Sequence, residues 1–416
     1  MKLDLTDMLY ALSYALDHVE SELLGLETGH SKRVTYLALL MGKEAGFREE
    51  ELRDFVGCCI LHDNALTEYI HEELSGSLVA QDLSVQISDE NKPKKKTMNQ
   101  HHCVVGEQNI CLLPFHTDVT DVIRYHHENA DGSGALGRTA AETPLKAQIL
   151  HLADMVDMTN RLTSITKTEF EELISWVQNK TGSLFSKEAS ELFLKAVTYE
   201  KLIYLKNKSI RDYLDEEIQT TVCDYSDEEI HNIAGLFSKI VDYKSPFTQS
   251  HSRNVAKKAE IMAHYYGFDA EKTIRFYLAG ALHDIGKLVV SNDILEKPGK
   301  LSDQEFTQIK NHSVATYYVL SRIKGISDIV RWASNHHETL DGTGYPQGLS
   351  AEDLSFEDRV MACIDIYQAL TEKRPYKDGF SHEKTISIMK EMVSGGKLDE
   401  KAVHDIDVAM LQNAVS

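Results

Sequence analysis

Residues 270–287 read AEKTIRFYLAGALHDIGK and combine a helical apolar period with a histidine and an aspartate. The apolar residues Ile274, Leu278 and Leu282 recur every four positions, and Ala281 stands three positions after Leu278. This spacing places them on one face of an α-helix, because 3.6 residues complete a turn. The stretch therefore predicts an amphipathic helix that carries a histidine, an aspartate and a lysine.

The same period recurs through nearly the whole chain. An example from the first half is formed by Leu37, Leu40, Met41 and Ala45. The alternation of Val, Ile and Thr that favours strands is scarce. Glycine-bearing turns interrupt the helical pattern, as in DGSG at 131–134 and DGTGYP at 341–346. We therefore predict an all-α fold.

The spacing of the histidines shows an internal repeat. His62 follows His30 by 32 residues, and His283 follows His251 by the same 32 residues. Further along, a His-His pair follows a single histidine by 24 residues in both halves. Ten of the 19 histidines fall on these repeated spacings, which surface histidines have no reason to do. The sequence therefore predicts two copies of one helical domain.

The repeat also sets the predicted domain boundaries. We expect a first helical domain at 1–195, a helical connector at 196–225 and a second domain at 226–416. The copies differ mainly in one interval, which is eleven residues longer in the first half and contains the polar segment ENKPKKK at 90–96. We interpret this segment as a solvated surface loop.

Composition and charge narrow the class of partner. The 416 residues include 44 Lys and Arg against 65 Asp and Glu, which gives a net charge of −21. This charge repels nucleic-acid polymers and acidic membranes, so metal ions or a few placed cations have to capture any anionic ligand. We find no signal peptide, no apolar run near the ~20 residues that cross a bilayer, and no CxxC pair among six cysteines. We expect a cytoplasmic protein with free thiols.

The second repeat collects seven side chains that can bind metals without a thiolate. They are His251, His283, Asp284, His312, His336, His337 and Asp365. Imidazole and carboxylate together suit divalent ions such as Fe, Mn, Zn or Co. Seven ligands exceed one coordination sphere, whereas two ions bridged by Asp284 would use them all and would suit a phosphoryl transfer. Because helical neighbours diverge by about 100°, each adjacent pair would reach different ions.

Lys287 completes the predicted catalytic set. It stands four residues after His283, on the same face of the expected helix. An ammonium there could contact a phosphate held on the metals. We therefore predict catalytic roles for Lys287 and Asp284.

Several motifs together resemble the HD-GYP branch of the HD metal-dependent phosphohydrolase superfamily. They are HDIGK at 283–287, KPG at 297–299, HHE at 336–338, GYP at 344–346 and RPYK at 374–377. The resemblance implies an all-α fold and the hydrolysis of cyclic dinucleotides, chiefly cyclic di-GMP to linear pGpG and then often to GMP. It also implies that the seven residues above hold two divalent ions, iron or manganese.

The resemblance further implies where the substrate binds. Tyr345, flanked by Gly344 and Pro346, would border the guanine. Arg374 and Lys377 would contact the second phosphate. That role also agrees with the charges, because a local Arg-x-x-Lys pair attracts a dianionic ligand that an acidic protein would otherwise repel.

Three positions depart from the family pattern. Phe247 stands where some members have a glutamate for a third metal, so we expect two ions. Thr339 replaces the usual arginine after His-His-Glu, and Gln368 replaces a usual aspartate. These two changes leave two alternatives open: a 3′,3′-cyclic GMP-AMP phosphodiesterase, and a receptor or docking module with weak turnover. The GYP and RPYK segments argue against an ordinary HD phosphohydrolase that acts on nucleoside mono- or triphosphates.

The first repeat keeps every ligand type but loses the catalytic parts. Its predicted metal site consists of His30, His62, Asp63, His102, His126, His127 and Asp154. Leu66 replaces the lysine, Thr163 replaces the arginine, and Gly134-Ala-Leu replaces Gly-Tyr-Pro. We predict a catalytically silent domain, either a regulator that senses a metal, a redox state or a ligand, or a relic that stabilises the catalytic half and a homodimer.

Overall fold

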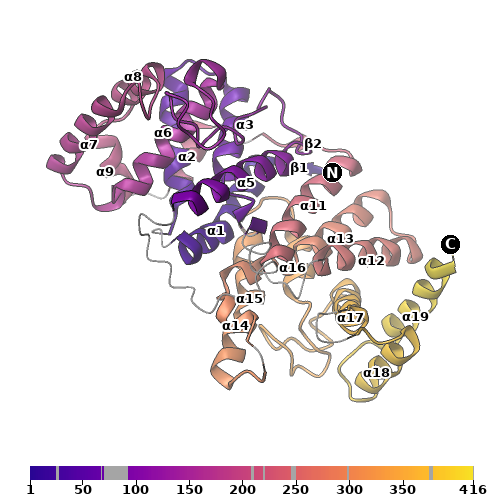
Figure 1. The fold of residues 1–416 in the computed structure, drawn as a ribbon. Helices are drawn as coiled ribbons and strands as arrows, with labels where there is room; N and C mark the ends of the chain where they lie inside the picture. Colours follow the sequence, from indigo (N-terminus) through magenta and orange to yellow (C-terminus); the bar gives the residue numbers. More distant parts are fainter. Residues whose placement is uncertain are drawn as a thin grey trace. The chain divides into compact units, whose positions relative to one another are not determined.

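The computed structural model describes residues 1–24, 28–66, 68–69, 92–207, 210–218, 221–244, 250–297, 299–373 and 378–415. The chain divides into two units (Figure 1). The N-terminal unit comprises Asp4–Val222, and the C-terminal unit comprises Met1–Leu3 together with Cys223–Ser416. Nearly all of the described regular structure is helical, so the predicted all-α fold is confirmed. The domain boundaries drawn from the repeat stay predictions.

The N-terminal unit is a helical bundle. Its elements are α1 (Leu5–Leu24), α2 (His30–Glu44), α3 (Glu49–Ile60), α5 (Lys92–Ile110), η2 (Ala140–Glu142), α6 (Leu145–Thr159), η3 (Leu162–Ser164), α7 (Lys167–Lys180), α8 (Lys187–Ala196), α9 (Tyr199–Asn207) and α10 (Ile210–Glu217). The last two helices pack on α2, since the hydroxyl of Tyr36 donates to the carbonyl of Lys201 at 3.0 Å and its ring meets that of Tyr213 edge to face.

The C-terminal unit repeats this plan. Its elements are β1 (Lys2–Leu3), β2 (Cys223–Asp224), α11 (Asp227–Tyr243), α12 (His251–Tyr265), α13 (Ala270–Leu282), η4 (Ile285–Val289), α14 (Asn292–Leu295), α15 (Asp303–Leu320), α16 (Ser327–Ser334), α17 (Phe356–Thr371), α18 (His382–Ser394) and α19 (Glu400–Val415). The two short strands pair antiparallel.

The predicted amphipathic helix forms the centre of the C-terminal unit. The side chain of Asp269 accepts a hydrogen bond from the amide of Lys272 and so caps the start of α13. The four apolar residues of the periodic face are all buried, because α13 packs against α11, α12 and α16. In the first half Leu37, Leu40 and Met41 are buried on α2, whereas Ala45 is the C-cap residue and is half-buried.

Helix α13 ends at Leu282, so the expectation that it continues through Lys287 is wrong. His283 is its C-cap, and Asp284 has left the helical conformation (φ −100°, ψ 9°) before η4 begins. The physical reason is Gly286, where a Cβ atom would lie 2.0 Å from the carbonyl oxygen of His312 on α15. Only glycine allows this close approach, which brings the end of α13 against α15.

Two further expectations about local structure also need correction. The His336-His337 pair lies just beyond α16, which ends at Ser334, and not inside a helix. The polar insertion at 90–96 is not all loop, because α5 begins at Lys92 within it.

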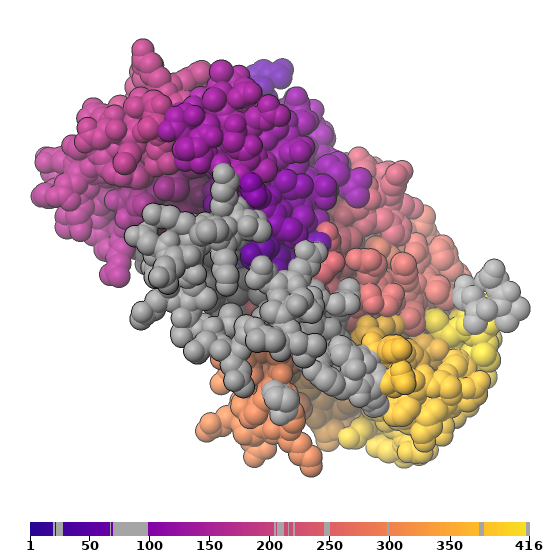
Figure 2. Space-filling model, in the orientation of Figure 1, coloured from indigo at the N-terminus to yellow at the C-terminus, as the bar shows by residue number. Residues whose placement is uncertain are grey.

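The outer surface of the C-terminal unit includes α18 and α19, coloured yellow in Figure 2. Only three residues of α18 are buried: Thr385, Ile386 and Met389. Across the described part of the chain, no helix combines the length and the apolar composition that crossing a membrane requires.

The packing at Gly286 leads to a testable prediction. Gly286→Ala should lower the free energy of unfolding by about 1–3 kcal/mol, because the new methyl group has to push η4 away from α15. The matched control is Gly235→Ala on α11, where a Cβ atom meets nothing within 4 Å and alanine should stabilise the helix by about 1 kcal/mol. Thermal melts of both variants check this, and equal melting temperatures would contradict the proposed contact.

Candidate metal centre

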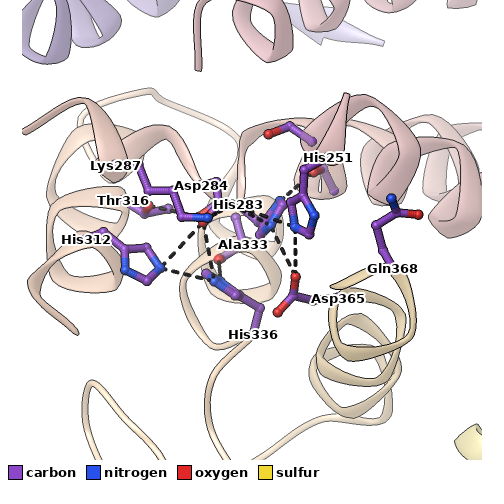
Figure 3. A network of polar contacts seen from close by, with 12 residues as sticks. His251, His283, Asp284, Lys287, His312, Thr316, Ala333, His336, Asp365 and Gln368 are labelled. Atoms are coloured by element: carbon purple, nitrogen blue, oxygen red, sulfur yellow. Dashed lines mark hydrogen bonds and ion pairs between the residues drawn. The ribbon is translucent and has the colours of Figure 1, made fainter. Parts of the chain in front are cut away.

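The seven predicted donors of the second repeat come together in the C-terminal unit, and Figure 3 labels all of them except His337. His251 is the first residue of α12, and His312 and Asp365 lie within α15 and α17. The two adjacent pairs, 283–284 and 336–337, follow the ends of α13 and α16. Five segments distant in sequence therefore meet at one place. Their roles as metal ligands stay a proposal, taken up below.

The carboxylate of Asp284 stands between two groups of imidazoles. Its Oδ2 lies 3.2 Å from Nε2 of His283 and 3.8 Å from Nε2 of His251. Its Oδ1 lies 3.5 Å from Nε2 of His312 and 3.9 Å from Nε2 of His336. Each oxygen thus faces a different pair of nitrogens, which is the arrangement that a carboxylate bridging two cations requires.

Asp365 also spans the two groups, because His337 lies with His312 and His336. Its Oδ1 lies 3.0 Å from Nε2 of His251 and 3.7 Å from Nε2 of His283. Its Oδ2 lies 3.7 Å from Nδ1 of His337. Both carboxylates and all five imidazoles therefore take part in one connected cluster.

The orientation of the rings shows what the cluster is built to hold. Nδ1 of His283, His312 and His336 each donates to a backbone carbonyl three residues earlier, at 2.8, 2.6 and 2.6 Å. This network assigns a hydrogen to Nδ1 of each ring and directs Nε2 inward, and in the neutral rings of His312 and His336 the Nε2 atom carries a lone pair. Nε2 of His312 and Nε2 of His336 lie only 3.3 Å apart. Two lone pairs at this distance call for a cation between them.

Buried atoms in the cluster support the same conclusion. Within the described residues, neither Nε2 of His283 nor Oδ1 of Asp284 has a hydrogen-bond partner, although both are buried. Buried polar atoms are nearly always paired, so such atoms need an explanation. Imidazole nitrogens and carboxylate oxygens are the donors that borderline divalent ions prefer, and the residues present therefore fit a divalent metal centre.

Charges within the cluster point the same way. Burial lowers the pKa of His312 to about 3 and holds that of His336 well below its ordinary value, so both rings are neutral. Burial alone would raise the pKa of Asp284, but the charges of His283 and Lys287 outweigh it and keep the carboxylate ionised. At His283, in turn, the nearby carboxylates outweigh burial and raise the pKa to about 10. The two carboxylates thus create a field that retains a cation.

Lys287 lies on the candidate bridging carboxylate. Its Nζ is 2.5 Å from Oδ2 of Asp284, and its side chain is partly exposed. The two residues are three positions apart in the sequence, and the 3-10 turn of η4 places such residues on one side. The ammonium therefore stands at the edge of the cluster, where it can reach both the carboxylate and a bound anion.

The predicted substrate loop begins beside the cluster. The ring of Tyr345 packs on that of His337 with centroids 4.7 Å apart, and Nζ of Lys310 lies 5.1 Å from the tyrosine centroid. A Cβ atom at Gly344 would lie 2.5 Å from the amide of Thr339, so this glycine shapes the loop. The half-buried Pro346 follows in the same loop. Arg374 and Lys377, together with Phe247, lie outside the described residues.

Sequence reasoning assigned no role to Glu338, which organises this loop. Its carboxylate is buried and accepts hydrogen bonds from the amides of Gln347 at 2.7 Å and Leu349 at 2.9 Å. Glu128 does the same in the N-terminal unit, where it accepts from the amides of Leu136 and Arg138. The repeated His-His-Glu tripeptide was the available signal. Lys310 was also missed, and no repeated spacing marks it.

The N-terminal unit reproduces the same geometry. Oδ2 of Asp63 lies 3.6 Å from Nε2 of His62, and its Oδ1 lies 3.4 Å from Nε2 of His102 and 3.9 Å from Nε2 of His126. Asp154 again spans both groups, with 3.2 Å from its Oδ1 to Nε2 of His30 and 3.7 Å from its Oδ2 to Nδ1 of His127. All seven predicted donors of the first repeat are therefore brought together.

Two features distinguish this N-terminal cluster. Leu66, at the position of Lys287, is buried. The thiol of Cys103 lies 4.0 Å from Nε2 of His102, whereas the other half has Ser313 at the matching position. Within the described residues, Nε2 of His62 and Nε2 of His126 are buried without a hydrogen-bond partner. The cluster thus offers inward-facing donors, and at the position of Lys287 it has an apolar side chain in place of an ammonium.

The fold and the two clusters define a tandem protein of the HD type. Residues 28–159 and residues 235–402 each match the HD domain family. The chain is 31% identical over 416 residues to 3′3′-cGAMP-specific phosphodiesterase 1 of Vibrio cholerae, covering 97% of this chain and 91% of that protein. The chain therefore belongs to the HD-GYP type of HD phosphodiesterases, which confirms the resemblance noted in the sequence.

Other relatives match over shorter segments. Phosphodiesterase 3 of the same cGAMP-specific group in V. cholerae is 31% identical over 297 residues, 70% of this chain and 63% of that protein. A cyclic di-GMP phosphodiesterase of Pseudomonas aeruginosa is 44% identical over 115 residues, 27% of this chain and 28% of that protein. The fold is similar to a crystal structure of a V. cholerae cyclic GMP-AMP-specific phosphodiesterase, with a TM-score of 0.65, 23% identity and coverage of 99% of this chain and 98% of that chain.

The duplicated glutamate provides a matched pair of variants. Glu338→Gln and Glu128→Gln should each weaken a charge-assisted clamp on backbone amides and lower the free energy of unfolding by about 1.5–3 kcal/mol. We expect only Glu338→Gln to reduce phosphodiester hydrolysis, because only its loop carries Tyr345. Melting curves and initial rates for both variants check this. Equal rates in the two variants would show that the loop does not serve the reaction.

Proposed function

We propose that this phosphodiesterase acts on 3′,3′-cyclic GMP-AMP at a two-metal centre in its C-terminal unit. The observation that carries the two-metal proposal is the carboxylate of Asp284, whose two oxygens face two separate pairs of imidazole nitrogens. We propose iron or manganese as the two ions and the seven residues of the cluster as their ligands. Of the two substrates considered from the sequence, the relatives favour cyclic GMP-AMP over cyclic di-GMP.

Two observations support the hybrid dinucleotide. The relative that spans nearly the whole chain is named as cGAMP-specific, whereas the cyclic di-GMP enzyme cited above matches only 27% of it. In addition, Thr339 replaces the family arginine, and its hydroxyl donates to Asp341 at 2.6 Å within the loop. Arginine is the side chain that pairs most specifically with a guanine edge. With threonine at position 339, the loop no longer has this arginine to select for a guanine, so the substrate does not need two of them.

The residues of this chain would divide the work as follows. Divalent ions at the centre would supply Lewis-acid activation of the phosphodiester and of water. The carboxylates of Asp284 and Asp365 would balance the positive charge of the bound ions. Lys287 would stabilise the negative charge that develops on the phosphate. Tyr345 would form an aromatic wall for a base, with Lys310 above its ring.

A substrate panel tests the function. The purified chain, loaded with manganese or iron, should hydrolyse cyclic GMP-AMP with a higher kcat/KM than cyclic di-GMP, and should leave nucleoside monophosphates and triphosphates intact. Asp284→Ala serves as the inactive control. Preference for cyclic di-GMP would overturn the substrate proposal, and tight binding without hydrolysis would favour the receptor alternative.

Lys287 has a separable role in turnover. Lys287→Ala should bind metal with unchanged stoichiometry but lower kcat by about 10²–10³, the usual loss for one contact to developing charge. Lys272→Ala is a suitable control, because this lysine pairs with Glu357 at a partly exposed position outside the cluster. Metal analysis and single-turnover rates check the prediction, and an unchanged kcat would remove Lys287 from the reaction.

We also propose that the N-terminal cluster binds metal without catalysing hydrolysis. Its donors face inward as in the other half, but Leu66 takes the place of the ammonium. The chain carrying both His283→Ala and Asp284→Ala should therefore be inactive yet retain stoichiometric metal. This metal should be lost when His62→Ala and Asp63→Ala are added. Elemental analysis measures the metal content of both variants. If the chain carrying His283→Ala and Asp284→Ala holds no metal, the N-terminal unit is better explained as a relic that stabilises the catalytic half.

A further inference from the structure

Gln368 stands where the family usually has an aspartate, and a carboxylate, that of Glu372, lies one helical turn later. Nδ1 of His251 donates to Oε2 of Glu372 at 3.2 Å. Glu372 is the C-cap residue of α17, and its side chain is 8% exposed. Nδ1 of His283, His312 and His336 donates to backbone carbonyls, whereas Nδ1 of His251 donates to a carboxylate that is not one of the seven donors. A buried carboxylate therefore sits directly behind the first histidine.

Gln368 connects this carboxylate to a cation. Its Nε2 donates to Oε1 of Glu372 at 3.2 Å, and its Oε1 accepts from Nζ of Lys258 at 2.6 Å. Asp365, Gln368 and Glu372 are spaced three and four residues apart and so share one face of α17 (Figure 3 draws the first two). The face thus carries, in order, a carboxylate that contacts the cluster, a neutral relay and an outer carboxylate.

In the N-terminal unit, the carboxylate behind the first histidine stands at the position that matches Gln368. There Nδ1 of His30 donates to Oδ2 of Asp157 at 2.7 Å. Asp157 follows Asp154 by three residues, as Gln368 follows Asp365, and Arg33 pairs with it at 2.6 Å. The position that matches Glu372, seven residues after the aspartate, is Arg161. Each half thus has one carboxylate behind its first histidine, on different turns of the equivalent helix.

We propose that Glu372 is the positioning residue for His251, and that it takes over in this chain the function that an aspartate at position 368 would have. A carboxylate behind a histidine fixes the hydrogen on Nδ1, orients the ring and makes Nε2 a stronger donor to a metal. The inference rests on the proposed metal centre. Gln368 is then not a loss of function but part of an exchange, with the carboxylate moved from residue 368 to residue 372.

The exchange predicts a specific rescue. In the intact chain carrying Asp63→Ala, which confines binding to the C-terminal centre, Glu372→Ala and Glu372→Gln should weaken manganese affinity about 10–100-fold. Adding Gln368→Asp to Glu372→Ala should restore most of that affinity, because a carboxylate then returns to the position that Asp157 has in the other half. Gln368→Asp alone serves as the matched control and should retain metal binding.

Metal titration, with melting temperature measured alongside, separates the outcomes. Rescue of manganese affinity by Gln368→Asp supports the inference. If all four variants bind manganese as tightly as the parent, Glu372 does not position His251. If Glu372→Ala lowers the melting temperature and Gln368→Asp restores neither stability nor affinity, its role is only to stabilise the end of α17. If the parent itself binds no metal, the proposed metal centre fails, and that result is distinguishable from the others.

Discussion

The arrangement of the C-terminal unit depends on the contacts between the carboxylate of Asp284 and four imidazoles. For the two oxygens of this carboxylate to face separate imidazole pairs, α13 has to end at Leu282, and η4 has to lie directly against α15. Gly286 permits that approach, because any side chain there would meet the backbone of His312. Burial of this charge is tolerated only with positive charge around it, from imidazolium, from Lys287 or from metal.

The duplicated scaffold shows which parts are tied to the fold and which to the chemistry. Both halves retain the seven donors, the glutamate that clamps the following loop and a carboxylate behind the first histidine. They differ in the ammonium, in the aromatic residue of the loop and in the turn that supplies the outer carboxylate. The N-terminal unit therefore keeps the donor cluster but lacks, at the matching positions, the lysine and the tyrosine for which we propose roles in turnover.

Much of this could be predicted from the sequence, because the helical period and the histidine spacings are local signals that the duplication confirms internally. The end of α13 could not be predicted from the sequence. It depends on the contact between Gly286 and α15, a helix that lies many residues further along the chain. Glu372 and Cys103 were missed because neither has a counterpart of the same type in the other half. The motifs alone imply cyclic di-GMP as the leading substrate, whereas the relative that matches nearly the whole chain favours the alternative, cyclic GMP-AMP.

We propose that Asp284 bridges two metal ions in the C-terminal unit. Anomalous diffraction at the manganese or iron edge, from crystals of the metal-loaded intact chain, would locate these ions. We expect two peaks about 3.5–4 Å apart, one beside each oxygen of this carboxylate. A single peak, or two peaks that do not share Asp284, would contradict this proposal.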